Sequence, residues 1–263
     1  MYTKDDLCFE VEKVSTSEEL KVNSMSDNCF SIIGQPKGER TLINTVSDRY
    51  RLTPISEHLG HIESAIQESF GSAYSAKYNM VNFSKFYVDY ILDEKLSFQV
   101  DDLHPRLRLQ HSYNGKLKTS VEIGIYRVIC KNGATTLERL ESAISFKNTI
   151  GNYNSLKSFV CNSLERLNKS KTLKVYEVLA DRAVTDFSDR ILEVATASKF
   201  PKKQIELVNE KLVEEAELFN VKPNDWLIYN AFNYQLNHNE EIQAHDEFKF
   251  NIDNSILQFM FNN

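Results

Sequence analysis

The sequence predicts an α+β fold, with an antiparallel β-sheet in the N-terminal and central part of the chain and a mainly helical C-terminal half. Polar and apolar residues alternate with period two on both sides of Asn114-Gly115, a residue pair typical of a tight hairpin turn. After about residue 150, apolar residues recur at helical spacing instead. Hydrophobic residues make up 41% of the 263 residues, so a substantial core is expected. Residues 1–150, β-rich with one helix at about 56–70, and the helical residues 151–263 are expected to pack as a single globular unit.

The first hundred residues are predicted to form short strands around that one helix. Extended segments at 29–33 and 41–46 flank a turn at 34–38, which contains Pro36 and two glycines. Ser56 is the expected cap of the helix, which ends near Gly71. Between residues 80 and 100, aromatic and β-branched residues predict two further strands with a break at 93–95.

A prominent β-hairpin is predicted over about residues 105–131. Because side chains alternate between the two faces of a strand, the basic residues of the hairpin lie opposite its leucines. Four cations are therefore expected on one exposed surface: Arg106, Arg108, Lys116 and Lys118. Arg127 has the other parity, and a bulge near Gly124 either brings it round to this surface or leaves it paired.

The C-terminal half is predicted to be helical. An apolar stripe runs from Leu156 to Leu167, and further helices are expected within 174–197, 202–219 and 225–236. Asn224 is a suitable cap for the last of these. The apolar tail at 247–261 fits either a final strand or a docking helix.

Charge is unevenly distributed along the chain, whose formal net charge is −6. Residues 105–131 carry six basic side chains against Glu122, and residues 132–204 are also basic, whereas residues 1–104 and 205–263 are acidic. A basic segment between acidic ones is typical of a patch that attracts phosphate. The alternative is that these charges pair with the acidic flanks or are simply solvated.

No catalytic motif is recognisable, so we expect neither an enzyme nor a cofactor. His58 and His61 lack a third ligand that the sequence would place beside them, and no metal site is predicted. Acidic pairs such as Asp101-Asp102, and Asp186 with Asp189, leave a metal-dependent nuclease as a third hypothesis. The chain has no apolar stretch of about 18 residues, and we expect it to be neither exported nor membrane-spanning.

The sequence also resembles a family of phage and plasmid proteins, domain of unknown function 932. The resemblance covers most of residues 41–240 and is carried by four motifs: Ser47-Asp-Arg-Tyr50, His111-Ser-Tyr-Asn-Gly115, Tyr126-Arg-Val-Ile-Cys-Lys-Asn-Gly133, and Asp225-Trp-Leu-Ile-Tyr-Asn-Ala231 with His238. Lys147-Asn148-Thr149 stands where the family has Arg-His-Thr. The resemblance implies a mobile-element protein of the bacterial cytoplasm and supplies no established reaction.

These observations favour a phage- or plasmid-encoded nucleic-acid-binding protein, a homo-oligomer that binds single-stranded DNA and anneals it in recombination or replication. A charged hairpin sheet followed by a helix is similar, at the level of fold, to phage annealing proteins of the Red-beta and Erf type. In this hypothesis Arg106, Arg108, Lys116, Lys118 and Arg127 contact phosphates, and Tyr113 stacks on a base. The alternative is a non-enzymatic interaction protein, a host-defence antagonist or a structural component, whose acidic C-terminal helices bind a host or phage protein.

Overall fold

The computed structural model confirms the α+β fold. It describes residues 2–16, 29–71, 73–93, 96–98, 101–115, 118–127, 132–134, 143–146, 153–162, 171–239, 242 and 246–263. The chain forms two compact units, each drawn from several stretches of sequence. Unit 1 comprises Met1–Glu94, Arg106–Ile123 and Ala143–Leu164, and unit 2 comprises Lys95–Pro105, Gly124–Ser142 and Glu165–Asn263.

Unit 1 contains a small antiparallel sheet near the N-terminus, in the order β1-β2-β3. Strand β1 (Val11–Ser15) pairs with β2 (Cys29–Gly34), which pairs with β3 (Thr41–Ser47). The two strands expected here are confirmed, and β1 was not predicted. The turn between β2 and β3 holds a short 3-10 helix, η1 (Pro36–Gly38), in which Lys37 and Gly38 both have positive φ.

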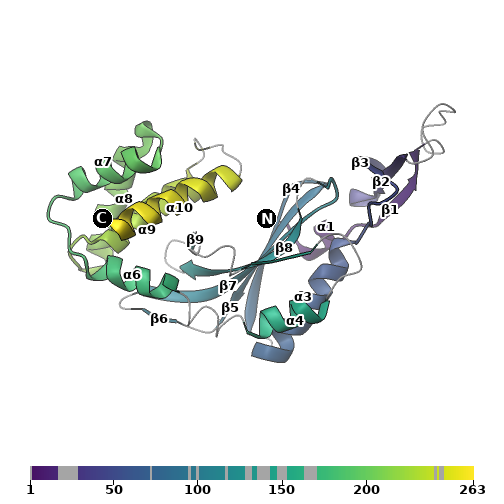
Figure 1. The fold of residues 1–263 in the computed structure, drawn as a ribbon, viewed down its shortest axis with the longest axis horizontal. Helices are drawn as coiled ribbons and strands as arrows, with labels where there is room; N and C mark the ends of the chain where they lie inside the picture. The colour runs from purple at the N-terminus through teal and green to yellow at the C-terminus, as the bar shows by residue number, and fades with distance from the viewer. Residues whose placement is uncertain are drawn as a thin grey trace. The chain divides into compact units, whose positions relative to one another are not determined.

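The larger sheet has seven strands, with the order β10-β8-β7-β5-β4 and with β6 and β9 paired to β7 and β8 (Figure 1). Its strands are β4 (Tyr74–Asn82), β5 (Lys85–Leu92), β6 (Leu96–Phe98), β7 (Asp101–Ser112), β8 (Thr119–Arg127), β9 (Asn132–Ala134) and β10 (Ala143–Phe146). The predicted break at 93–95 separates β5 from β6. The sequence did not reveal the turn between β4 and β5, where the Asn82 side chain accepts hydrogen bonds from the backbone and hydroxyl of Ser84.

Strands β7 and β8 are the two arms of the predicted hairpin. Strand β7 ends at Ser112 and β8 begins at Thr119, so the connection is longer than the expected two-residue turn. Gly115 in this connection has φ +68°, a conformation that glycine adopts at little cost. Bonding with β5 and β8 places β7 inside the sheet rather than at its edge.

Helix α3 (Ile55–Phe70) covers one face of the large sheet. Its buried side chains Leu59, Ile62 and Ile66 recur at helical spacing, as the sequence predicted. The helix begins one residue before the expected cap, because Pro54 and not Ser56 occupies the N-cap position. Short helix α1 (Lys4–Leu7) and helix α4 (Tyr153–Cys161) complete the described helices of unit 1, while Leu164 and Leu167 of the predicted stripe lie outside the described residues.

Unit 2 gathers its helices into one group (Figure 1). These helices are α6 (Lys171–Asp181), α7 (Phe187–Ser198), η2 (Lys202–Gln204), α8 (Ile205–Phe219), α9 (Asp225–His238) and α10 (Asp246–Asn262). Helix α9 is buried nearly all round and contacts α6, α8 and α10. The tail that the sequence left ambiguous is therefore helix α10. No helix of the described residues is both long enough and apolar enough to cross a bilayer.

Candidate nucleic-acid interface

Four basic side chains gather on one face of the large sheet in unit 1. They come from three neighbouring strands: Lys77 from β4, Lys85 from β5, and Arg106 and Arg108 from β7. The strand register pairs Lys77 with Asp89 and pairs Asp89 with Arg108, so these residues share a face. We call this set, with Asp89 and Tyr87, the basic sheet face. The opposite face packs on α3.

Asp89 is the centre of the basic sheet face. Arg108 donates hydrogen bonds from Nε and Nη2 to the two carboxylate oxygens, at 2.7 and 2.9 Å, and Nε of Arg106 lies 3.8 Å from Oδ1. Burial raises the pKa of this carboxyl, but the charges of Arg108 and Arg106 outweigh burial and hold the pKa at about 2. The described side chains of these three strands place four cations and Asp89 on this face. Thr119 of the neighbouring strand β8 bonds His111 on the α3 side, so the alternation of β8 adds a second carboxylate, Glu122, to the basic sheet face. Among these residues the cations still outnumber the carboxylates.

Tyr87 lies among these cations. The Nζ of Lys85 is 5.1 Å from the centroid of its ring, and the guanidinium of Arg108 is 5.9 Å away, distances at which a cation is attracted to a ring face. The Tyr87 side chain is buried, and those of Lys77, Lys85 and Arg108 are half-buried. The basic groups therefore reach solvent around a ring that holds them in place.

The structure only partly supports the exposed row of hairpin cations that the sequence predicted. Arg106 is buried and Arg108 is bound to Asp89, because β5 lies beside β7 and supplies a carboxylate opposite the arginines. Lys118 is exposed near the hairpin turn as expected. Lys116 lies outside the described residues.

Arg127 belongs to unit 2 and is fully buried, so the expectation that it reaches solvent is wrong. Its Nη1 donates a hydrogen bond of 2.6 Å to Glu215 Oε2 of α8, and neither side chain is exposed. The guanidinium also lies 5.4 Å from the ring of Phe219 and 6.0 Å from that of Trp226. The alternative that the sequence left open, in which Arg127 is paired, is the one observed. Its partner comes from the acidic C-terminal segment.

Tyr113 is also fully buried, which is incompatible with the expected stacking on a base in this conformation. Its hydroxyl accepts a hydrogen bond of 2.9 Å from the backbone N–H of Ile55, the first residue of α3. A helix leaves its first N–H groups without partners inside the helix, and Pro54 supplies no capping side chain. Tyr113, the residue after β7, therefore links the start of α3 to the end of that strand by a hydrogen bond.

Two buried histidines occupy the space between α3 and the sheet. The rings of His58 on α3 and His111 on β7 have centroids 4.9 Å apart, and His111 Nδ1 lies 2.8 Å from the hydroxyl oxygen of Thr119. Burial lowers the pKa of His58 to about 4 and that of His111 well below its usual value. Both rings are therefore neutral at pH 7 and add no positive charge. Among the described residues, no group of three or more His, Cys, Asp or Glu side chains is placed to hold a metal ion.

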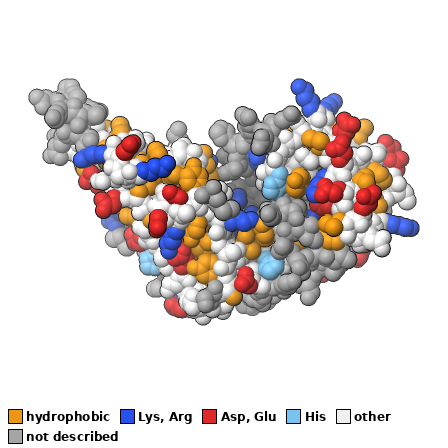
Figure 2. Space-filling view, turned by 180° about the vertical axis from the view of Figure 1, so that it is seen from behind, with side chains coloured by type: hydrophobic (Ala, Val, Ile, Leu, Met, Phe, Trp, Pro, Cys, Tyr) orange, Lys and Arg blue, Asp and Glu red, His pale blue; other side chains and the backbone are white. Residues whose placement is uncertain are grey.

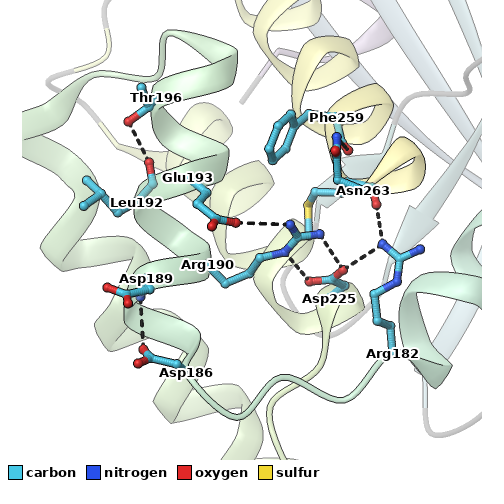
Figure 3. A network of polar contacts seen from close by, with 11 residues as sticks. Arg182, Asp186, Asp189, Arg190, Leu192, Glu193, Thr196, Asp225, Phe259 and Asn263 are labelled. Carbon is cyan, nitrogen blue, oxygen red and sulfur yellow. Dashed lines mark hydrogen bonds and ion pairs between the residues drawn. The ribbon is translucent and has the colours of Figure 1, made fainter.

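Unit 2 contains a second polar network, centred on the fully buried Asp225 at the start of α9 (Figure 3). Arg190 of α7 donates hydrogen bonds to both carboxylate oxygens of Asp225, at 3.1 and 2.9 Å. Nη1 of Arg182 lies 3.2 Å from Oδ2 of Asp225. Arg182 also donates to the backbone carbonyl of Met260 in α10. The Asp225 carboxylate of α9 thus contacts α7 directly through Arg190, and α10 indirectly through Arg182.

Sequence reasoning found two members of the basic sheet face, Arg106 and Arg108, and missed Lys77, Lys85 and Tyr87. The alternation Lys85-Phe-Tyr-Val-Asp89 was a usable signal, because it places Lys85, Tyr87 and Asp89 on one face of a strand. The pairing of that strand with β7 was not deducible from local sequence.

A family model described as "Domain of unknown function (DUF932)" matches residues 42–256, most of the chain. Neither the curated proteins nor the solved structures contain a match.

Proposed function

Because the chain belongs to the family described as domain of unknown function 932, a description that names no activity, we propose its function from its own residues: it binds nucleic acid through the basic sheet face. One observation carries the proposal. Cations from three adjacent strands share one face, where Arg106 and Arg108 contact Asp89, Lys77 is its register partner, and Lys85 lies over the ring of Tyr87. Phosphates are bound by such groups of Lys and Arg.

The resemblance to phage and plasmid proteins supports a more specific form of this proposal. The protein is mobile-element-encoded, works in the bacterial cytoplasm as a homo-oligomer, and binds single-stranded DNA during recombination or replication, where it anneals complementary strands. Lys77, Lys85 and Arg108 make the phosphate contacts, and Lys118 at the hairpin turn adds a fourth. Arg106 supports Arg108 by sharing Asp89.

A salt titration with a fluorescent oligonucleotide tests the proposal. For each phosphate neutralised on a single strand, counterion release lowers the logarithm of affinity by about 0.7 per unit of the logarithm of salt concentration, so the four contacts named above give a slope of magnitude about 3. The variant Lys85→Glu should weaken binding by about tenfold or more and flatten this slope. Lys222→Glu makes the same charge change at an exposed residue of unit 2 and is the matched control.

A second variant is expected to change the affinity for DNA in the opposite direction. Asp89→Asn removes a negative charge from the basic sheet face and should strengthen binding, provided that a thermal melt shows the variant folded. Lys118→Glu separately measures the contribution of the hairpin turn. The proposal is refuted if the protein does not bind nucleic acid at low salt, or if Lys85→Glu and Lys222→Glu weaken binding equally.

A further inference from the structure

A groove between α7 and α10 in unit 2 has features of a docking site. It has a volume of about 470 Å³, within the range of roughly 300–1,000 Å³ typical of ligand sites. Its lining is apolar at Leu192, Ala197 and Phe259 and acidic at Asp189 and Glu193, and Thr196 completes it. This groove is separate from the basic sheet face, which belongs to unit 1.

Apolar and acidic groups of the groove are both available to a partner. Leu192 is 52% exposed, a large fraction for an aliphatic side chain beside a second helix. The Glu193 side chain is 62% exposed and touches Arg190 only at 3.4 Å. Arg190 makes its shorter bonds to the buried Asp225. Arg190 is thus engaged mainly by Asp225, a carboxylate that it shares with Arg182, and the carboxylates of Asp189 and Glu193 remain at the rim of the groove.

The walls of the groove are held in place by the network around Asp225. Arg190 leaves α7 toward Asp225, and its guanidinium lies 5.7 Å from the centroid of the Phe259 ring (Figure 3). Arg182 adds the bond to the carbonyl of Met260, next to Phe259 in α10. The Thr196 hydroxyl donates a hydrogen bond to the backbone carbonyl of Leu192 within α7. The groove is thus preformed, so a partner does not have to order it on binding.

We propose that this groove binds a basic peptide segment of a partner protein, with a Lys or Arg side chain along its floor. Such a side chain lays an apolar stem on apolar surface and keeps its charged end in water, which matches apolar Leu192 and Phe259 beside the carboxylates of Asp189 and Glu193. The high exposure of Leu192 indicates an open groove, suited to side chains of a macromolecule more than to an enclosed small molecule. The described lining of the groove contains two carboxylates and no Lys or Arg, and such a local charge attracts a basic side chain.

The exposed surface of the helical unit offers control positions for a test of the groove. Figure 2 shows Asp, Glu, Lys and Arg side chains interspersed with apolar ones on the part of the molecule formed by the helices. Helix α8 presents exposed Leu207, Val213 and Leu218 among its glutamates. These residues do not line the groove, and they provide matched controls.

The test uses the full chain and a short fluorescent peptide of repeated Lys-Leu pairs, with a peptide of Glu-Leu pairs for comparison. Fluorescence anisotropy should show binding of the basic peptide alone. Leu192→Ser and the double variant Asp189→Asn/Glu193→Gln should each weaken it by about tenfold. The controls Leu218→Ser and Glu206→Gln/Glu210→Gln remove the same apolar side chain and the same number of charges on α8, and should change affinity by less than about twofold. All of these side chains are exposed, so the variants should fold, as thermal melts will check.

Several results would overturn the inference. The groove is not the site if the control variants weaken binding as much as the groove variants, because the attraction is then a general effect of the acidic segment. Equal binding of the two peptides, or no binding at low salt, excludes a basic partner. Self-association that Leu192→Ser abolishes would assign the groove to a second copy of this chain instead. None of these readouts depends on nucleic acid, so the outcome is independent of the function proposed above.

Discussion

Breaking the buried pair of Arg127 and Glu215 should destabilise unit 2 strongly. Both side chains are fully buried, and Arg127 Nη1 lies 2.6 Å from Glu215 Oε2. The substitution Glu215→Leu removes the carboxylate and leaves the arginine charge in a site without water contact. Lys211, which lies 3.9 Å from Glu215 Oε1, keeps its closer partner Glu214 at 3.0 Å. The cost therefore falls mainly on Arg127.

The expected loss follows from the energetics of buried charges. Removing one partner of a buried ion pair costs about 3–5 kcal/mol, because the remaining charge stays desolvated after it has lost its ion-pair partner. For a domain of about 150–250 residues, each kcal/mol lowers the melting temperature by about 2–4 °C, so the variant should melt roughly 6–20 °C below the parent. Replacing both residues, as Arg127→Met/Glu215→Leu, should restore most of the stability. Methionine is flexible and packs well on aromatic rings, here those of Phe219 and Trp226.

Urea unfolding of the parent, the two single variants and the double variant forms a double-mutant cycle. The double variant should also bind single-stranded DNA with the affinity of the parent, because Arg127 does not reach solvent. The reasoning fails if Glu215→Leu loses less than about 1 kcal/mol, or if the four free energies of unfolding are additive. A folded double variant that has lost DNA binding would return Arg127 to the interface that the sequence predicted.

The other predictions concern the packing of unit 1 and one helix cap of unit 2. The folded-state pKa of His58, about 4, lies below its unfolded value near 6.5, so its contribution to stability is complete above pH 6.5 and is lost as pH falls toward 4. In urea unfolding between pH 7 and 4, the free energy of unfolding of His58→Leu should therefore fall less with acid than that of the parent. An equal fall in both proteins would contradict this. Tyr113→Phe removes the acceptor for the Ile55 N–H and should cost about 1–2 kcal/mol in thermal unfolding without changing DNA affinity; a loss of affinity at unchanged stability would instead favour base stacking. Asn224→Ala removes the side-chain cap of α9 and should cost about 1 kcal/mol, which chemical denaturation measures; no change would mean that tertiary contacts alone hold this end.

Local patterns predicted most of the elements because their causes are local. The alternation in residues 106–127 gave β7 and β8, and the spacing of Leu59, Ile62 and Ile66 gave α3. The cap at Asn224 was identified correctly from sequence. Two details depended on tertiary context. The tail, which fitted either a strand or a docking helix, is helix α10 and packs on α7 and α9. The start of α3 is not capped by Ser56 as expected, and its first N–H is bonded by Tyr113, a residue 58 positions away.

The candidate interface shows a similar division. The sequence by itself determined that Arg106 and Arg108 share one face of a strand, because side chains alternate with period two. Only the tertiary structure decided their surroundings: strand pairing placed Asp89 beside them and added Lys77 and Lys85 to the same face. It also buried Arg127 against Glu215, 88 positions away. A charge in a sequence has no partner until the chain folds, and whether it is buried and paired or faces solvent depends on contacts that no local pattern specifies.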